Sequence, residues 1–187
     1  MGGAFGGKIS RPSQIACAAA LACHLTKRPV RLIMTMESNI AAIGKRFSAL
    51  SDYEVEVDDN GKIQKLKNHY IQDVGCSLNE PVHFNTTPFL KNCYDFKSWD
   101  ITTQSAVTNS ASNTWMRAPG TTEAIAMTEH IMEHIARKTG KDPVDVRMQN
   151  LSEDSEFKTL LPDFVKSVGR HKSLVIILNF DINCNSP

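Results

Sequence analysis

The sequence predicts a mixed α/β (α+β) fold in which helices pack on sheet segments. Three observations support this class: an alanine-rich apolar run follows Pro12, two alternating segments flank a turn at residues 58–61, and a helical stripe of apolar residues follows Gly120. Helix and strand signals in one chain are typical of a layered domain. With 187 residues, the chain is long enough for one ordinary domain or two small ones.

The first helix is expected to begin near Pro12. Residues 13–25 are rich in alanine and apolar nearly all round, which predicts a helix buried on most faces. Ser10 is expected to cap this helix, and Pro12 stands in the first turn, where its missing N–H is not needed. After a stop at residues 27–29, apolar residues at alternate positions of residues 30–36 predict a half-buried strand.

The central segments predict a β-hairpin and a further strand. Residues 48–57 and 62–75 flank an Asp-Asp-Asn-Gly turn, which is a strong hairpin signal. The expected packing residues are Tyr53, Val55 and Val57 in the first arm and Ile63, Leu66 and Tyr70 in the second. Residues 76–100 are predicted to be irregular, and residues 101–110 to form a strand.

The segment after Gly120 predicts a long helix with an apolar stripe formed by Ala124, Met127, Ile131 and Ile135. His130 and His134 lie four residues apart on it, but Glu133 is misplaced for the H-E-x-x-H metal motif, so a solvated face is predicted. Gly140 should end this helix. A second helix should begin at Asp142-Pro143, and a third, shorter one should cover residues 160–168.

Composition excludes several functional classes. The 21 basic and 20 acidic residues are scattered, which argues against a nucleic-acid partner. The five cysteines include no C-x-x-C pair, so no disulfide framework, zinc site or iron–sulfur site is indicated, and a reducing compartment fits best. No apolar run reaches the roughly 18 residues of a membrane helix, and a secretion signal is not recognisable. We therefore expect a cytoplasmic protein without a membrane partner.

The glycine loop of residues 1–11 runs directly into the first helix. Its glycines let backbone N–H groups approach a ligand, and the start of the helix favours an anion. Gly2 and Gly7-Lys8 have the spacing of a phosphate-binding P-loop, but Ile9 stands where that motif needs Ser or Thr for Mg²⁺. Phe5 at the centre favours a second interpretation, a pocket for a flat ligand.

A second loop supports this interpretation through a family resemblance. Residues 2–9, Gly-Gly-Ala-Phe-Gly-Gly-Lys-Ile, resemble the molybdenum-cofactor loop of the aldehyde oxidase and xanthine dehydrogenase family. Residues 112–120 resemble the family's Ser-Asn-Thr-x-x-Arg-x-x-Gly loop, and residues 28–31 and 147–151 resemble further family segments. We expect residues 1–169 to be part of a molybdenum-cofactor-binding domain and residues 170–187 to be a divergent C-terminal tail.

The resemblance implies a fragment of a molybdenum hydroxylase. Such an enzyme hydroxylates an aldehyde or N-heterocycle with water-derived oxygen, using molybdenum-molybdopterin, two [2Fe-2S] clusters and FAD, and is a homodimer. The family's catalytic base is a Glu that would lie outside this chain, as would the cluster and flavin domains, so we expect no activity from the chain alone. The alternatives are a non-catalytic scaffold or binding fragment and, more remotely, a P-loop NTPase.

The resemblance also assigns roles to residues, none of which is a direct metal ligand. Phe5 and Gly6 would flank the metal's ligand sphere, Arg117 would donate charge-assisted hydrogen bonds near it, and Ala118 would be its neighbour. Pro119 would help to wall the substrate slot.

Ile9 would face the same slot and points to the branch of the family. The xanthine-oxidising branch has a Glu at this position, together with an Arg upstream of the second loop. This chain has Ile9 and no Arg between Arg46 and Arg117. Both differences imply the aldehyde branch and an apolar substrate pocket.

Overall fold

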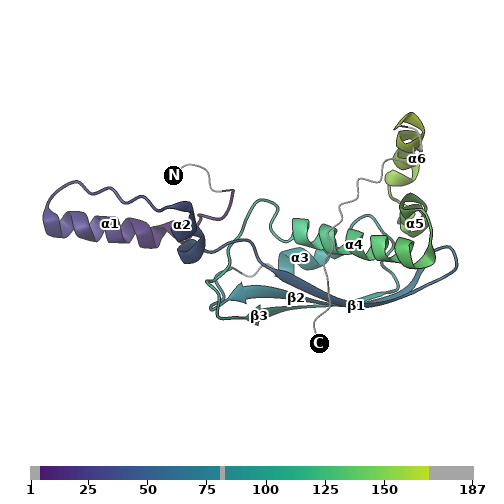
Figure 1. Ribbon diagram of the computed structural model, residues 1–187, viewed down its shortest axis with the longest axis horizontal. Helices are drawn as coiled ribbons and strands as arrows, with labels where there is room; N and C mark the ends of the chain where they lie inside the picture. Colours follow the sequence, from purple (N-terminus) through teal and green to yellow (C-terminus); the bar gives the residue numbers. More distant parts are fainter. Residues whose placement is uncertain (1–4, 81–82, 169–187) are drawn as a thin grey trace.

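The computed structural model describes residues 5–80 and 83–168 and confirms the α+β class. The described residues form six helices and a three-stranded mixed sheet (Figure 1). In chain order the elements are α1 (Pro12–Thr26), α2 (Met36–Ile43), β1 (Ala49–Val57), β2 (Ile63–Gly75), α3 (His83–Leu90), β3 (Trp99–Val107), α4 (Thr121–Thr139), α5 (Pro143–Asn150) and α6 (Phe157–Val168). The predicted tail of residues 170–187 lies outside the described residues.

The sheet has the order β1-β2-β3 and combines both kinds of pairing. β1 and β2 form the predicted antiparallel hairpin, and the Asp58 carboxylate accepts hydrogen bonds from the backbone N–H groups of Asn60 and Lys62 in its turn. β3 pairs in parallel with β2, which the sequence did not indicate. A parallel pair needs a crossover, and α3 lies within it, so the prediction that residues 76–100 are irregular was wrong for that part.

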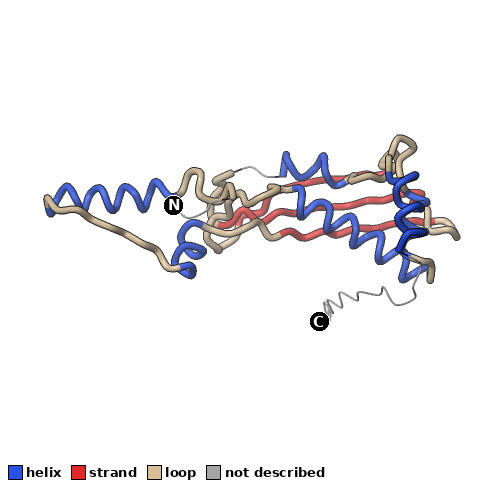
Figure 2. The backbone as a smooth tube through the Cα atoms, turned by 90° about the horizontal axis from the view of Figure 1, so that it is seen from above, coloured by secondary structure: helices blue, strands red, loops and turns tan. Residues whose placement is uncertain are grey.

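One face of the sheet is covered by helices. α4 and α3 lie over this face, and α5 packs beside the end of α4 (Figures 1 and 2). The main core joins Leu66 of β2 to Ile131 and Met132 of α4 and Val146 of α5. The other predicted packing residues behave similarly: Ile63, Tyr70, Ala124 and Ile135 are buried, and Tyr53, Val55, Val57 and Met127 are partly buried.

Three expectations for the N-terminal part were wrong. Within the described part of the chain, α1 buries none of its side chains, because it extends away from the sheet instead of packing on it (Figure 1). Its N-cap is Arg11 with no side-chain cap, so Ser10 does not cap it. Residues 30–35 have no regular structure, and the Thr35 side chain caps α2, which begins where the strand was expected to end.

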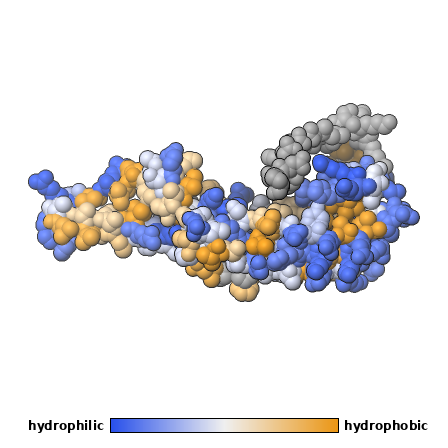
Figure 3. Space-filling view, turned by 60° about the horizontal axis from the view of Figure 1, so that its bottom comes forward, coloured by the Kyte–Doolittle hydropathy of each residue, from blue (hydrophilic) through white to orange (hydrophobic). Residues whose placement is uncertain are grey.

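The N-terminal arm, which we define as residues 12–43, presents a largely apolar surface to solvent. Leu25 is 71% exposed, and Figure 3 shows apolar side chains gathered over this extension. The large exposed apolar residues of the arm are Leu21, Leu25, Val30, Leu32, Ile33, Met36 and Ile40. An exposed apolar surface of this kind is typical of a region that contacts another surface.

Asn150 fastens α5 to the hairpin turn. Its side-chain oxygen accepts a hydrogen bond from the Ile63 N–H at 2.8 Å, and its amide nitrogen donates to the carbonyl oxygens of Gly61 and Val146 at 2.9 and 2.8 Å. Asn150 itself is buried, so water does not replace these partners.

Asn150→Ala should therefore lower the free energy of unfolding by about 1–3 kcal/mol, the cost of leaving buried polar groups without partners. The measurement is urea-induced unfolding followed by circular dichroism. Asn109→Ala, at an exposed asparagine on the loop after β3, is the matched control and should change stability by less than about 0.5 kcal/mol. Equal losses in the two variants would contradict the role given to Asn150.

Candidate functional site

The first loop, residues 5–11, turns sharply before it enters α1. Phe5 and Gly6 both have positive φ angles, of 48° and 96°. A non-glycine residue in this region is uncommon and marks a special backbone conformation. Phe5 is 68% exposed. A Cβ built on Gly6 would lie 3.8 Å from Trp115, so the first loop lies directly against the second.

The second loop, residues 108–120, connects β3 to α4 and is anchored by hydrogen bonds to the rest of the fold. Ser112, Asn113 and Thr114 are buried. The Asn113 backbone N–H donates to the Val74 carbonyl at 3.0 Å, and the Thr114 N–H donates to the Lys45 carbonyl at 3.0 Å. The loop is thus bound both to the end of β2 and to the segment that follows α2.

Asp73 organises the start of the second loop. Its Oδ1 accepts hydrogen bonds from the Gly75 N–H and the Thr108 hydroxyl, both at 2.7 Å, and the Ser110 hydroxyl donates to Oδ2 at 3.4 Å. Burial alone would raise the pKa of Asp73, but these hydrogen bonds outweigh it and lower the pKa. Asp73 is therefore ionised at neutral pH.

Two glycines allow the second loop to come this close. A Cβ at Gly44 would lie 2.0 Å from the Ser112 carbonyl oxygen, and one at Gly75 would lie 2.4 Å from the Ala111 carbonyl oxygen. Both contacts are far shorter than any real Cβ makes, and both involve backbone atoms that cannot rotate away. Only glycine fits at these two positions.

Glu80 joins the two loops. Its Oε1 accepts a hydrogen bond from the Ser10 hydroxyl at 3.2 Å, and its Oε2 accepts from the Thr114 hydroxyl at 3.1 Å and from the Trp115 backbone N–H at 2.7 Å. One carboxylate thus bonds a residue of the first loop and two residues of the second. Nothing in the sequence singles out Glu80, because an acid in a segment predicted to be irregular carries no signal of its own.

Arg46 holds the other end of the second loop. Its Nη2 donates to the Arg117 carbonyl at 2.7 Å, and its Nη1 lies 3.1 Å from Oε1 of Glu123 in the first turn of α4. The Glu123 side chain is only 10% exposed, so this pair is partly desolvated. From the sequence, Arg46 is only the last arginine before the stretch without arginine that ends at Arg117; its position beside the second loop depends on the tertiary fold.

The residues singled out by the resemblance lie on these two loops. Gly6 contacts the second loop, and Phe5, Ile9, Arg117 and Ala118 are exposed, with Ile9 at 75%. Ala118 has a positive φ of 55°, and Pro119 is partly buried. The structure therefore brings together the two segments that the sequence analysis paired, while the roles of the individual side chains stay predictions.

Unpaired donors show whether a cofactor fits here. In the part of the chain that the structure describes, four buried side-chain N–H groups have no hydrogen-bond partner: Arg11 Nε, Asn79 Nδ2, Trp99 Nε1 and Trp115 Nε1. Trp99 packs against the main core at the start of β3, away from the two loops. Arg11 and Asn79 are the chain neighbours of Ser10 and Glu80, and Trp115 is bonded to Glu80. Buried donors without partners are rare. Three of the four belong to residues that are bonded at this junction or are next to it in the chain, which fits a ligand rich in hydrogen-bond acceptors, as molybdopterin is.

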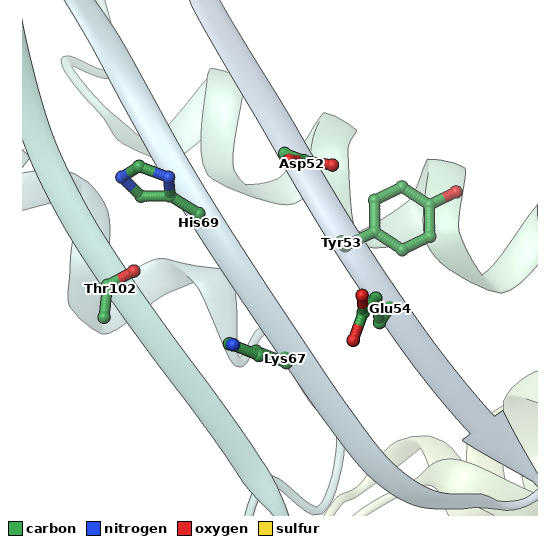
Figure 4. A pocket seen from close by; sticks show the side chains of 6 residues that line it. All are labelled: Asp52, Tyr53, Glu54, Lys67, His69 and Thr102. Carbon is green, nitrogen blue, oxygen red and sulfur yellow. The ribbon is translucent and has the colours of Figure 1, made fainter.

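Two pockets lie away from the loops. One, of about 320 Å³, is on the polar face of the sheet, where Asp52, Lys67, His69 and Thr102 come from all three strands (Figure 4). The other, of about 430 Å³, lies between β1 and α4. Neither is lined by a residue of the two loops.

His130 and His134 were predicted to lie on a solvated face, and both are exposed. Their rings are 4.3 Å apart between centroids, and the Tyr53 hydroxyl is hydrogen-bonded to Nδ1 of His134. Among the described residues, no group of three or more His, Cys, Asp or Glu side chains is placed to hold a metal ion.

Two backbone loops fastened at one junction, on an α+β scaffold, define a domain that is built to hold a cofactor between loop and helix ends. The chain belongs to the molybdopterin cofactor-binding domain family, whose model matches residues 1–151. Members of this family are molybdenum oxidoreductases, as the resemblance implied, and the comparisons favour neither the scaffold nor the NTPase alternative.

Proteins similar in sequence to this chain are named as oxidases of aldehydes or as a hydroxylase of nicotinate. The chain is 29% identical to an indole-3-acetaldehyde oxidase of Zea mays over the whole chain and 14% of that protein. It is 31% identical to a putative aldehyde oxidase-like protein of Oryza sativa, over 96% of the chain and 13% of the relative. A nicotinate hydroxylase of Emericella nidulans is 32% identical over 81% of the chain and 11% of its own length. The chain thus spans only about a seventh of such relatives or less.

Solved structures confirm the fold. The chain matches aldehyde oxidoreductase from Desulfovibrio gigas with a TM-score of 0.71 and 22% identity, over 90% of this chain and 19% of that one. CO dehydrogenase from Oligotropha carboxidovorans matches with a TM-score of 0.74 and 22% identity, over 91% of this chain and 24% of that one. In the described ranges, no helix is both long and apolar enough to cross a membrane.

Proposed function

We propose that this chain supplies two loops of the molybdenum-molybdopterin site in an aldehyde-oxidising molybdenum hydroxylase. The observation that carries the proposal is the junction at Glu80, where one carboxylate binds both loops. The residues with unpaired buried donors, Arg11, Asn79 and Trp115, are bonded there or are next to it in the chain. Residues 1–169 would form part of the cofactor-binding domain. The four described cysteines are free thiols, which supports a reducing, cytoplasmic compartment, and assembly as a homodimer stays a prediction.

In this proposal the protein residues bind and orient, while the bound molybdenum centre supplies the hydroxylation chemistry with water-derived oxygen. The backbone at Phe5, Gly6 and Ala118, whose φ angles are positive, would lie against the cofactor. The exposed Arg117 side chain would donate charge-assisted hydrogen bonds to its anionic groups. Its backbone is fixed by Arg46, so this guanidinium starts from a defined position.

The proposed substrate is an apolar aldehyde. Ile9 presents an apolar side chain at the end of the first loop and offers no hydrogen bond to a ring nitrogen. Relatives named as indole-3-acetaldehyde oxidase and aldehyde oxidase-like protein are consistent with an aldehyde. The relatives named nicotinate hydroxylase and xanthine dehydrogenase make an N-heterocycle the competing substrate class.

The isolated 187-residue chain should carry little or no molybdenum and should not oxidise aldehydes. Its two loops supply only part of a cofactor cradle, and the chain spans a small share of its relatives. The measurements are metal analysis of the purified chain and dye reduction with benzaldehyde. Stoichiometric molybdenum together with aldehyde-dependent reduction would contradict this expectation.

Arg117→Ala, made in a longer protein that contains these residues, tests the proposed function directly. Loss of a charged donor beside an anionic cofactor should reduce kcat by roughly ten- to a hundredfold, equivalent to about 1.5–3 kcal/mol. Arg137→Ala is the matched control, because Arg137 is exposed and lies at the far end of α4. An unchanged kcat in Arg117→Ala, with full molybdenum content, would remove Arg117 from the site.

Ile9→Glu in the same longer protein tests the substrate class. The unmodified protein should oxidise benzaldehyde and reject xanthine, because a purine would lose its hydrogen-bond partners in an apolar slot. The new carboxylate should weaken aldehyde turnover and give only partial purine turnover, since it lacks a partner when buried. Ile9→Leu keeps the apolar character and should change neither. Equal oxidation of xanthine and benzaldehyde by the unmodified protein would refute the aldehyde assignment.

A further inference from the structure

The first loop and the second loop are attached to the fold very differently. The second loop is held by backbone hydrogen bonds from Asn113 and Thr114 and by the bond from Arg46 to the Arg117 carbonyl. The described attachments of the first loop beyond its own helix are the Gly6 contact with Trp115, the Ser10 bond to Glu80 and a long bond of 3.5 Å from Arg11 to the Ala42 carbonyl.

We propose that Glu80 is the positioning residue that holds the first loop against the second and so sets the geometry of the cofactor junction. The inference rests on the proposed function for the meaning of the two loops. Its structural basis is independent, because the three hydrogen bonds to Glu80 are formed within this chain.

The chemistry of the carboxylate suits this task. A carboxylate has about four acceptor positions on two oxygens, and Glu80 uses both oxygens at once. Its Oε2 binds the second loop through a backbone N–H at 2.7 Å, a short charge-assisted bond, while Oε1 is left for Ser10. Glutamine is neutral and has one acceptor oxygen in place of two, so it keeps a bond to Ser10 only if its amide nitrogen donates to the hydroxyl oxygen, and both loops lose a charge-assisted bond.

The loss of Glu80 should therefore act unequally on the two loops. The second loop keeps its other anchors, whereas the first loop loses one of its few attachments. The quantity that changes is the free energy of local opening of the first loop. When opening and closing are fast relative to cleavage, this free energy sets the rate at which a protease cuts the loop. Trypsin can report the opening of both loops, because it cleaves after Lys8 in the first loop and after Arg117 in the second. It does not cleave after Arg11, because Pro12 follows.

The experiment is limited trypsin digestion of the full 187-residue chain, with cleavage at each site followed by mass spectrometry. Glu80→Ala should raise the rate of cleavage after Lys8 by about tenfold, the effect of losing one hydrogen bond to a charged group, and should leave cleavage after Arg117 within about twofold. Ser10→Ala should reproduce the effect at Lys8 alone. Glu80→Gln should give an intermediate rate, and Glu54→Ala, at an exposed acid on the open face of β1, should change neither site.

Trp115 provides a spectroscopic signature that general destabilisation would not produce. The chain has two tryptophans, so Trp99→Phe leaves Trp115 as the single reporter. In that background Glu80→Ala should shift the emission of Trp115 to longer wavelength at a temperature well below unfolding. Ser10→Ala should leave the emission unchanged, because the hydrogen bond from the Trp115 backbone N–H to Glu80 is retained.

Wild-type cleavage rates and unchanged Trp115 emission in Glu80→Ala would overturn the inference. Equal acceleration at Lys8, Arg117 and the remote Lys158 would also overturn it, since that result means global destabilisation. If Glu80→Ala does not fold, Ser10→Ala decides: unchanged cleavage after Lys8 refutes the link. Absence of molybdenum from the longer protein would refute the proposed function. It would not affect the cleavage and fluorescence results, which are measured on the 187-residue chain.

Discussion

The close backbone approach at Gly44 and Gly75 is the constraint on which the candidate site depends. At both positions a carbonyl of the second loop occupies the space that a Cβ would need. Because the loop is pressed onto the end of β2 and the end of α2, Thr114 and Trp115 have fixed positions where Glu80 can reach them. Without that approach, the second loop would not have a fixed position at the junction.

The same approach explains the polar composition around the second loop. A loop packed this tightly excludes water, so its buried backbone and side-chain groups need protein partners. Asp73 and Asn113 provide several of them. The hydrogen bonds to the partly buried Asp73 lower the pKa of its carboxyl group, against the effect of desolvation. Arg46 and Glu123 perform the equivalent task at the entrance to α4.

Local signals predicted the elements well and the long-range contacts poorly. The hairpin, the stripe on α4 and the start of α5 at Asp142-Pro143 depend on neighbouring residues, and each was confirmed. The parallel position of β3 and the exposure of α1 depend on which surfaces meet, which periodicity does not encode. Apolar alternation in residues 30–36 was misleading, because Thr35 caps a helix that begins at Met36.

The candidate site divides in the same way. Glycine spacing and the Arg117 motif identified both loops, since those features are local in sequence. Glu80 and Arg46 were missed because their importance comes from partners 34 to 77 residues away. No local pattern distinguishes either residue from an ordinary surface charge.

The arm follows directly on the first loop, so a contact that restrains the arm also bears on how firmly that loop is held. Each large apolar side chain of the arm would contribute about 1.5–3 kcal/mol if it moved from solvent into a packed surface, so covering residues such as Leu25 and Ile33 would stabilise the arm strongly. α1 follows directly on the first loop, whose link to the fold runs through Ser10 and Glu80. A surface that covered the arm would therefore restrain the first loop through α1, while Glu80 restrains it through the bond to Ser10. The anchored second loop supplies the fixed reference, and the geometry of the proposed cofactor site depends on how firmly the first loop is held against it.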